Sequence, residues 1–186
     1  MNSKVTHINV GNLAENCWFL ANEDTKEAVV IDPGAEPDRI CAAAEKHGWK
    51  ITAILLTHGH IDHMGACESL RTELGVKVYA LTEEEDLLLD AKKNLSVFIE
   101  RKVVTFEPDE LLRDGQELTL AGMKIQVIHT PGHTPGGCSY YVAEAGCVFS
   151  GDTLFAESVG RSDFPGGSTS ALVRAVKEKL FLLPDD

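Results

Sequence analysis

The chain has 186 residues, which suits one domain, and 44% of them are hydrophobic, enough to bury a substantial core. Its formal net charge of -12 argues against a nucleic-acid partner, because phosphate binding depends on clustered Lys and Arg. The same charge disfavours an anionic membrane surface, and we find no stretch long enough to span a bilayer. We therefore expect one domain over residues 1–186 that acts on a small molecule; the sequence leaves its oligomeric state open.

The cysteines predict a reduced environment. Five are present, an odd count without any C-x-x-C pair, which favours neither a disulfide framework nor a zinc finger. The N-terminal residues include no continuous apolar region of the kind found in a secretory signal. Reduced thiols are typical of the cytosol, so we expect a cytoplasmic protein.

The first third of the chain is predicted to form strands and then a helix. Segments 5–10, 16–21 and 27–31 are rich in Val, Ile, Phe and Trp and are bounded by turn residues, the pattern of short strands. A helix is expected over 37–47, because Pro37 opens it, its apolar residues have helical spacing and a glycine follows.

The next segment predicts a buried strand followed by a helix. Residues 51–56 are continuously apolar, as in a strand buried on both faces. Helical spacing then runs over 62–74, Gly75 ends it, and 76–80 is another short strand. The polar segment between the buried strand and the helix therefore lies at a strand-to-helix corner, where active sites are common.

An acidic run, Glu83 to Asp86, follows the strand at 76–80. Thr82 and Glu85 have the spacing of a capping box at a helix start. Acidic residues stabilise the first turn of a helix, so we expect this run to be a solvated face without a function.

The second half predicts antiparallel hairpins and a last helix. Residues 91–115 show no clear pattern, and a helix is expected over 168–180. Strands are expected at 117–120, 124–129, 137–143 and 147–149, with glycines in two of the turns between them. Strands and helices are thus mixed along the chain, which predicts an α/β domain with sheets covered by helices.

A dense group of metal-binding residue types lies at the corner after strand 51–56. His58 and His60 are two residues apart, so in extended chain their rings point to the same side and can reach one cation. Asp62 and His63 follow at the expected helix start and point elsewhere, where they could serve a second cation. Imidazole suits zinc, iron and related ions, and a carboxylate can complete the shell, so this spacing predicts metal binding.

Two further residues are candidates for the same site. His133 lies between two Pro-Gly pairs, which fix sharp turns and hold it on a rigid loop. Asp152 follows the apolar strand 147–149; alone it would be read as a helix cap or turn former, but beside the histidines a metal-bridging carboxylate is the better interpretation. We therefore add both to the predicted site.

These motifs together resemble a known family. The segments Thr57 to His63, Pro131 to Gly136 and Gly151 to Phe155, in this order, are similar to those of the metallo-β-lactamase superfamily, and most of all to glyoxalase II and its short bacterial homologues. The resemblance extends over nearly the whole chain from Ile31. It implies an αββα sandwich with two divalent metal ions at one edge, zinc in first place and iron or manganese as alternatives.

The resemblance also implies roles for individual residues. His58, His60 and His133 match the ligands of the first metal, Asp62 and His63 those of the second, and Asp152 the carboxylate that bridges both. Asp32 matches an acid near the site, with an indirect or structural role, although a turn residue at a strand end is an equal alternative.

The family pattern asks for one more histidine in a Pro-Gly-His-Gly segment after the last helix. The sequence contains no such segment; it ends at Asp186, about where the segment would begin. The fold is thus expected to lack its C-terminal segment, or the second site to use fewer ligands. Three protein donors and a bridging hydroxide still make four, so we expect weaker binding and partial occupancy at the second site.

The expected activity is hydrolysis by a metal-bound hydroxide. Divalent ions lower the pKa of bound water and polarise a carbonyl, and Asp62 can orient or relay a proton, which makes it the candidate catalytic residue. Resemblance to glyoxalase II implies a thioester such as a hydroxyacyl-glutathione. Arg161 lies near the place where that family carries a basic residue for a glutathione carboxylate; pairing with Asp163 or simple solvation are equal alternatives.

Two other functions stay open at this point. A persulfide dioxygenase with a single iron shares the motif, and the unmatched second-site histidine keeps this alternative. A folded domain without catalysis, truncated and retained for protein interaction, is the non-enzymatic alternative. β-Lactamase activity is disfavoured because we find no secretory signal, and ribonuclease activity by the acidic charge.

Overall fold

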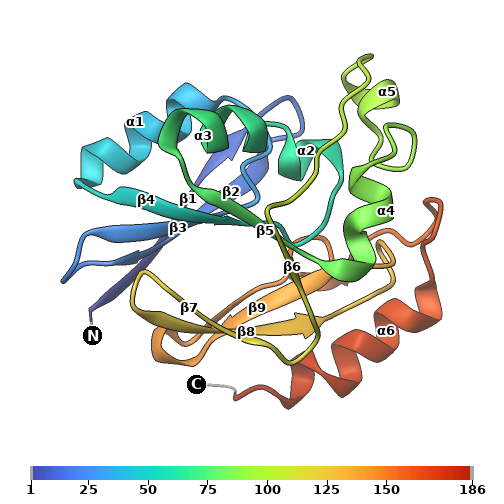
Figure 1. The fold of residues 1–186 in the computed structure, drawn as a ribbon. Coiled ribbons are helices and arrows are strands. Elements are labelled where there is room, and N and C mark those ends of the chain that lie inside the picture. Colours follow the sequence, from blue (N-terminus) through green and yellow to red (C-terminus); the bar gives the residue numbers. More distant parts are fainter. Residues whose placement is uncertain (1, 185–186) are drawn as a thin grey trace.

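The computed structural model describes residues 2–184, and their elements form four layers (Figure 1). One sheet has six strands in chain order. The first three strands pair antiparallel in two consecutive hairpins, whereas β3 to β6 run parallel and are joined by crossovers. These strands are β1 (Ser3–Val10), β2 (Glu15–Asn22), β3 (Glu27–Ile31), β4 (Lys50–Leu55), β5 (Lys77–Leu81) and β6 (Glu110–Leu112).

The second sheet has four antiparallel strands in the order β10-β9-β8-β7. It packs face to face on the first sheet through alternate residues of both, including Leu20, Leu55, Ile125 and the fully buried Tyr140. Its strands are β7 (Glu117–Leu120), β8 (Met123–His129), β9 (Cys138–Val142) and β10 (Cys147–Phe149).

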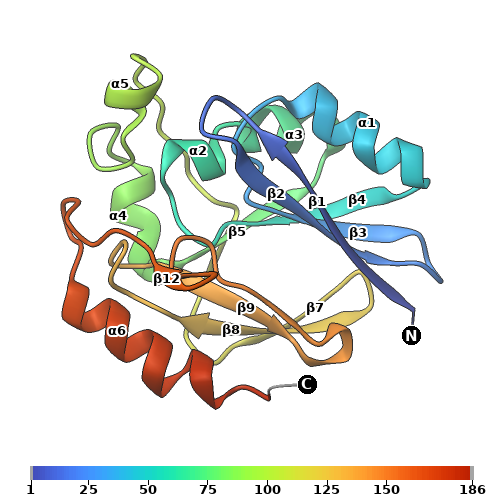
Figure 2. The same cartoon turned by 180° about the vertical axis from the view of Figure 1, so that it is seen from behind.

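Helices cover the outer faces of both sheets. Helices α1 (Pro37–His47) and α3 (Cys67–Leu74) lie on the six-stranded sheet, and α6 (Thr169–Glu178) lies on the other (Figures 1 and 2). Helix α1 buries Ile40 and Ala44, which are one helical turn apart, and ends where Gly48 takes a left-handed backbone. The predicted αββα sandwich is therefore confirmed.

Shorter elements connect these layers. None of the helices in residues 2–184 has the length and apolar composition needed to cross a membrane. The short pieces are α2 (Ile61–Met64), η1 (Thr82–Glu84), α4 (Glu85–Leu88), α5 (Ser96–Ile99), η2 (Ala143–Ala145), β11 (Leu154–Phe155), β12 (Ser158–Val159) and η3 (Leu180–Leu182).

The single helix expected over 62–74 is wrong, because the chain is interrupted between α2 and α3. A Cβ atom on Gly65 would lie 2.3 Å from the Gly34 carbonyl oxygen, so only glycine allows this close approach. The amide of Ala66 then donates to the Pro33 carbonyl at 2.9 Å instead of continuing the helix. The break packs α2 against the turn that follows β3, and Asp32 begins that turn.

The expected capping box is also wrong. The Thr82 hydroxyl donates to the carbonyl of Leu112 at 2.8 Å, so it is unavailable to cap a helix. Helix α4 begins after η1 without any side-chain cap, and Glu84, expected to be solvated, is buried.

Candidate metal centre

The predicted site residues gather at one edge of the two sheets. Because β3 and β4 are parallel, their carboxyl ends meet at the same edge, which brings Asp32 next to Thr57 and the histidines that follow it. The loops after β8 and β10 bring His133 and Asp152 to this edge from the facing sheet. The site is therefore built between the sheets, as the resemblance implied.

Three imidazoles form the first group of donor atoms. The Nδ1 atom of His60 lies 3.1 Å from Nε2 of His58 and 3.0 Å from Nε2 of His133. Atoms that bind one tetrahedral zinc ion at about 2.0–2.1 Å lie about 3.3–3.4 Å from one another, so this spacing fits a shared cation. The structure thus brings together the three residues assigned to the first metal.

Burial keeps these imidazoles neutral. It is the largest cause that lowers the pKa of each, well below the usual value for His58 and to about 3 for His60, and to a lesser degree for His133. Neighbouring histidines lower the pKa of His58 and His60 further, since like charges repel. Neutral imidazole is the form that binds metal ions, so the site is prepared for a cation without losing protons.

His63 is oriented by Asp32. Its Nδ1 lies 3.0 Å from Oδ2 of Asp32, which also accepts from the Thr57 hydroxyl at 2.6 Å, while Oδ1 accepts from the Thr57 amide at 2.7 Å. A carboxylate behind a histidine fixes the ring and directs its other nitrogen to a metal. This geometry supports the indirect role that the sequence suggested for Asp32.

The other nitrogen of His63 faces a group of carboxylates. Its Nε2 is buried and has no hydrogen-bond partner among the described residues. The nearest oxygens belong to Glu15 at 3.3 Å, Asp152 at 3.4 Å and Asp62 at 3.8 Å. Burial opposes a charge on this ring, but Asp32, Asp152 and Glu15 together hold its pKa well above the usual value. A buried, unpartnered ring nitrogen among carboxylates fits a second cation.

Asp152 lies between the two groups. Its Oδ1 is 3.4 Å from Nε2 of His63, and its Oδ2 is 3.4 Å from Nε2 of His133. Burial raises its pKa, but the facing histidines outweigh burial and lower the pKa overall, so Asp152 stays ionised. The preceding Gly151 has φ 49°, and a Cβ there would lie 2.2 Å from the Thr57 hydroxyl, so glycine is required for this approach.

Two glutamates that the sequence reasoning missed belong to the surroundings of the site. Glu84 is buried and accepts from the Gly59 amide through Oε1 and from the Gly136 amide through Oε2, both at 2.8 Å. It therefore joins the loop of His58 and His60 to the loop of His133. Burial raises its pKa to about 7 against the opposing effect of these two bonds.

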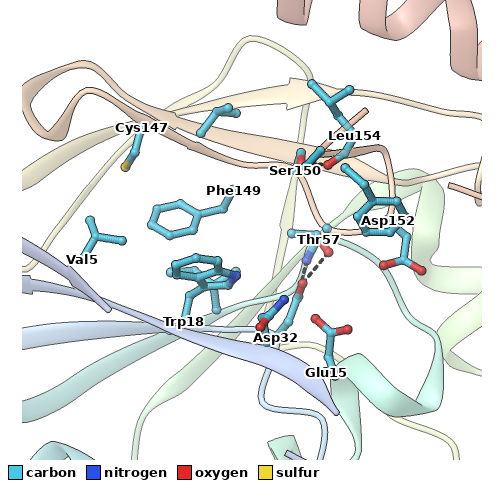
Figure 3. Close-up of a pocket in the computed structure, with 16 residues that line it drawn as sticks. Val5, Glu15, Trp18, Asp32, Thr57, Cys147, Phe149, Ser150, Asp152 and Leu154 are labelled. Carbon is cyan, nitrogen blue, oxygen red and sulfur yellow. Dashed lines mark hydrogen bonds between the residues drawn. The ribbon is translucent and has the colours of Figure 1, made fainter. Parts of the chain in front are cut away.

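Glu15, the first residue of β2, is the second missed residue. Burial raises its pKa to about 7, opposed by His63 and supported by the surrounding carboxylates. It lines a pocket of about 320 Å³ beside Asp32, Thr57 and Asp152, and the opposite end of this pocket is apolar (Figure 3). No local pattern distinguishes Glu15, because only the fold brings β2 to His63.

Arg161 contributes to the site through its backbone. Its carbonyl oxygen lies 2.7 Å from Nδ1 of His133 and orients that ring. Its guanidinium pairs with Asp163 at 2.9 and 2.8 Å, covers the ring of Phe164 and is largely exposed. The structure thus shows the Asp163 pairing that the sequence left as an alternative, and a substrate role stays a prediction.

Comparison with known proteins agrees with the fold. The family described as "Metallo-beta-lactamase superfamily" matches residues 10–186. The probable metallo-hydrolase YqgX of Bacillus subtilis is 38% identical over 177 residues, which cover 95% of this chain and 83% of the relative. The hydroxyacylglutathione hydrolase GloC of Haemophilus influenzae is 35% identical over 174 residues, covering 92% and 82%.

Solved structures show the same likeness. The BLEG-1 B3 metallo-β-lactamase is 37% identical with a TM-score of 0.91, over 97% of this chain and 87% of its own. TTHA1623, solved in a di-iron-bound form, is 36% identical with a TM-score of 0.84, over 97% and 88%. ETHE1 from Myxococcus xanthus is 28% identical with a TM-score of 0.76, over 100% and 72%.

Fold and site together define a metallo-hydrolase whose His and Asp cluster suits a divalent metal ion. The chain belongs to the metallo-β-lactamase superfamily.

Proposed function

We propose that this protein hydrolyses a thioester, such as a hydroxyacyl-glutathione, with two divalent metal ions. The observation that carries the proposal is the pair of adjoining donor groups: three buried imidazoles on one side, the unpartnered Nε2 of His63 on the other, and Asp152 within 3.4 Å of both. In this proposal His58, His60 and His133 hold the first ion, Asp62 and His63 the second, and Asp152 binds both.

The residues of the site have distinct tasks. Bound divalent ions would lower the pKa of a water molecule toward neutrality and polarise the substrate carbonyl. Asp32 and the Arg161 carbonyl hold the rings of His63 and His133 in place. The carboxylate of Asp62 lies at the rim, 3.8 Å from Nε2 of His63 and partly exposed, where it can hold a proton of the attacking water or pass it to the leaving thiol.

The pocket beside the second donor group provides room for a substrate. Its polar end holds Glu15 and Asp152, and its far end is lined by Val5, Trp18 and Phe149 (Figure 3). Such a combination of apolar wall and few polar groups is typical of small-molecule sites. The likeness to GloC supports a hydroxyacyl-glutathione as the first substrate to test.

We propose zinc as the metal, because the first group consists of imidazoles, which zinc binds well. Iron and manganese are the alternatives, and the likeness to the di-iron form of TTHA1623 supports iron. We also propose a cytoplasmic protein with a small-molecule substrate and no nucleic-acid or membrane partner, on the strength of its acidic charge and reduced cysteines.

The test is hydrolysis of a hydroxyacyl-glutathione by the metal-loaded protein, with the released thiol measured. A His58→Ala, His60→Ala double variant should lose turnover entirely. The control is His47→Ala, an exposed histidine outside the site, which should keep the wild-type rate. The proposal would be overturned if the His58→Ala, His60→Ala variant still hydrolysed the thioester. It would also be overturned if the wild type showed no hydrolysis when loaded with zinc, with iron or with manganese.

A second candidate is a persulfide dioxygenase with one iron. The compact group of three imidazoles can hold a single ion without the second group, and the likeness to ETHE1 supports this candidate. Oxygen uptake with a glutathione persulfide by the iron-loaded protein, without thioester hydrolysis, would favour it. Stoichiometric metal without either activity would favour a domain that does not catalyse.

A further inference from the structure

We infer that Glu15 is a ligand of the second metal ion, and that it gives that ion a fourth protein donor. The inference deepens the proposed function and rests on its second metal site. Sequence motifs supply three protein donors there, Asp62, His63 and Asp152, and none of the motifs includes β2. The fourth donor comes from the first residue of that strand.

The distances place Glu15 with the other donors. Its Oε2 lies 3.3 Å from Nε2 of His63, shorter than the distances from that nitrogen to Asp152 and Asp62. Donors of a tetrahedral zinc site are about 3.3–3.5 Å apart, so Glu15 has the spacing expected of a ligand pair with His63. Donor atoms of Glu15, Asp62 and His63 all lie within 4.8 Å of one another.

The buried nitrogen of His63 points independently to a ligand. His63 is fully buried, its Nδ1 is used by Asp32, and its Nε2 has no hydrogen-bond partner in residues 2–184. An unpaired buried polar atom destabilises the folded protein, so such atoms are rare unless something binds them. A cation at this nitrogen would satisfy it and the carboxylates around it at the same time.

The charges of the site favour the same reading. Glu15, Asp62 and Asp152 bring three carboxylates around one imidazole, and Asp32 adds a fourth behind it. Neither Lys nor Arg pairs with any of these four carboxylates among the ion pairs of the described residues. Carboxylates gathered around one imidazole repel one another, and a divalent cation is a partner that offsets this repulsion.

The experiment measures metal affinity rather than activity. Zinc is titrated into the metal-free full chain against a competing chelator, and the retained metal is counted after gel filtration. For Glu15→Gln we expect the dissociation constant of the second ion to rise at least about tenfold, since even groups behind a ligand have effects of this size. The first ion, which is held by the three histidines and Asp152 and does not contact Glu15 in this proposal, should bind as in the wild type.

Further variants separate ligation from a structural role. Glu15→His replaces the carboxylate with another zinc ligand and should restore most of the second-ion affinity. Glu144→Gln, an exposed glutamate that belongs to neither donor group, is the matched control and should change neither ion. If Glu15→Gln does not fold, Glu15→Asp keeps the charge but shortens the reach, and should also weaken only the second ion.

Retention of a tightly bound second ion by the folded Gln or Asp variant would overturn the inference, as would equal weakening of both ions. The result is independent of the substrate. If the wild type has no thioesterase activity but Glu15→Gln loses the second ion, the proposed function is wrong and the assignment of Glu15 as a ligand is supported. If the wild type is active but Glu15→Gln keeps both ions, the proposed function is supported and the assignment of Glu15 is wrong.

Discussion

Glu84 joins the two loops that carry the first group of histidines, so its removal tests how this site is held together. In Glu84→Ala the amides of Gly59 and Gly136 lose their acceptor inside the protein. Each unpaired buried amide costs about 1–3 kcal/mol, which gives a loss of about 2–6 kcal/mol in the free energy of unfolding. The loops would also hold His60 and His133 less firmly.

The size of this loss in the free energy of unfolding depends on pH, because Glu84 titrates differently in the folded and unfolded states. Burial raises the pKa of Glu84 from 4.5 to about 7, so the folded state favours its protonated form. Protonation of Glu84 therefore stabilises the folded state by about 3 kcal/mol below pH 4.5. This contribution to the free energy of unfolding is lost as the pH rises through 7. In Glu84→Ala this pH-dependent contribution to stability is absent. Its deficit relative to the wild type should therefore be larger at pH 5 than at pH 8, by about 2–3 kcal/mol.

The assay is urea unfolding of metal-free protein at pH 5 and pH 8, with both variants measured against the wild type. Glu83→Ala, an exposed neighbour, is the control and should stay within about 0.5 kcal/mol of the wild type at both values. An alanine variant at position 84 as stable as the control at pH 5, or a deficit that grows toward pH 8, would refute this reasoning.

Three shorter predictions concern other residues of the site. Asp32→Asn should weaken binding of the second zinc ion by about 10–100-fold in a zinc titration, because the ring of His63 loses its carboxylate. Binding of the first ion should weaken less, and equal effects on both ions would contradict this prediction. Arg161→Ala should leave the free energy of unfolding nearly unchanged in urea unfolding, since its ion pair is exposed. The KM of the same variant for a hydroxyacyl-glutathione tests whether the guanidinium meets substrate. Burial raises the pKa of Cys147 from 9.0 to about 11. At pH 8 iodoacetamide should therefore alkylate Cys147 about a hundredfold more slowly than an unperturbed thiol, as measured by peptide mass spectrometry. Alkylation at the rate of an unperturbed thiol would be evidence against this burial.

The histidine cluster could be predicted because its information is local. A strand that ends before His58 places His60 on the same side, and turns fixed by Pro-Gly pairs hold His133 on a rigid loop. The order of strands and helices likewise predicted sheets covered by helices, and the two-sheet sandwich followed from the resemblance. Patterns of this kind depend on neighbours in the chain, and a single sequence contains them.

The two glutamates could not be predicted, because their surroundings come from distant segments. Glu84 is one of four consecutive acids, and nothing local distinguishes it from its exposed neighbour Glu83. Glu15 begins a strand that reaches His63 only when the sheet has formed. The helix break at Gly65 has the same origin, since it depends on the approach of Gly34, about thirty residues earlier.

Anomalous diffraction from crystals of the zinc-loaded protein tests directly whether two ions bind at the proposed donor groups, because it locates each ion. We expect two peaks, with Asp152 between them. One lies among the ring nitrogens of His58, His60 and His133, and the other lies beside Nε2 of His63 and the carboxylates of Glu15 and Asp62. A single peak in zinc-saturated crystals, or a second peak away from His63, would contradict it.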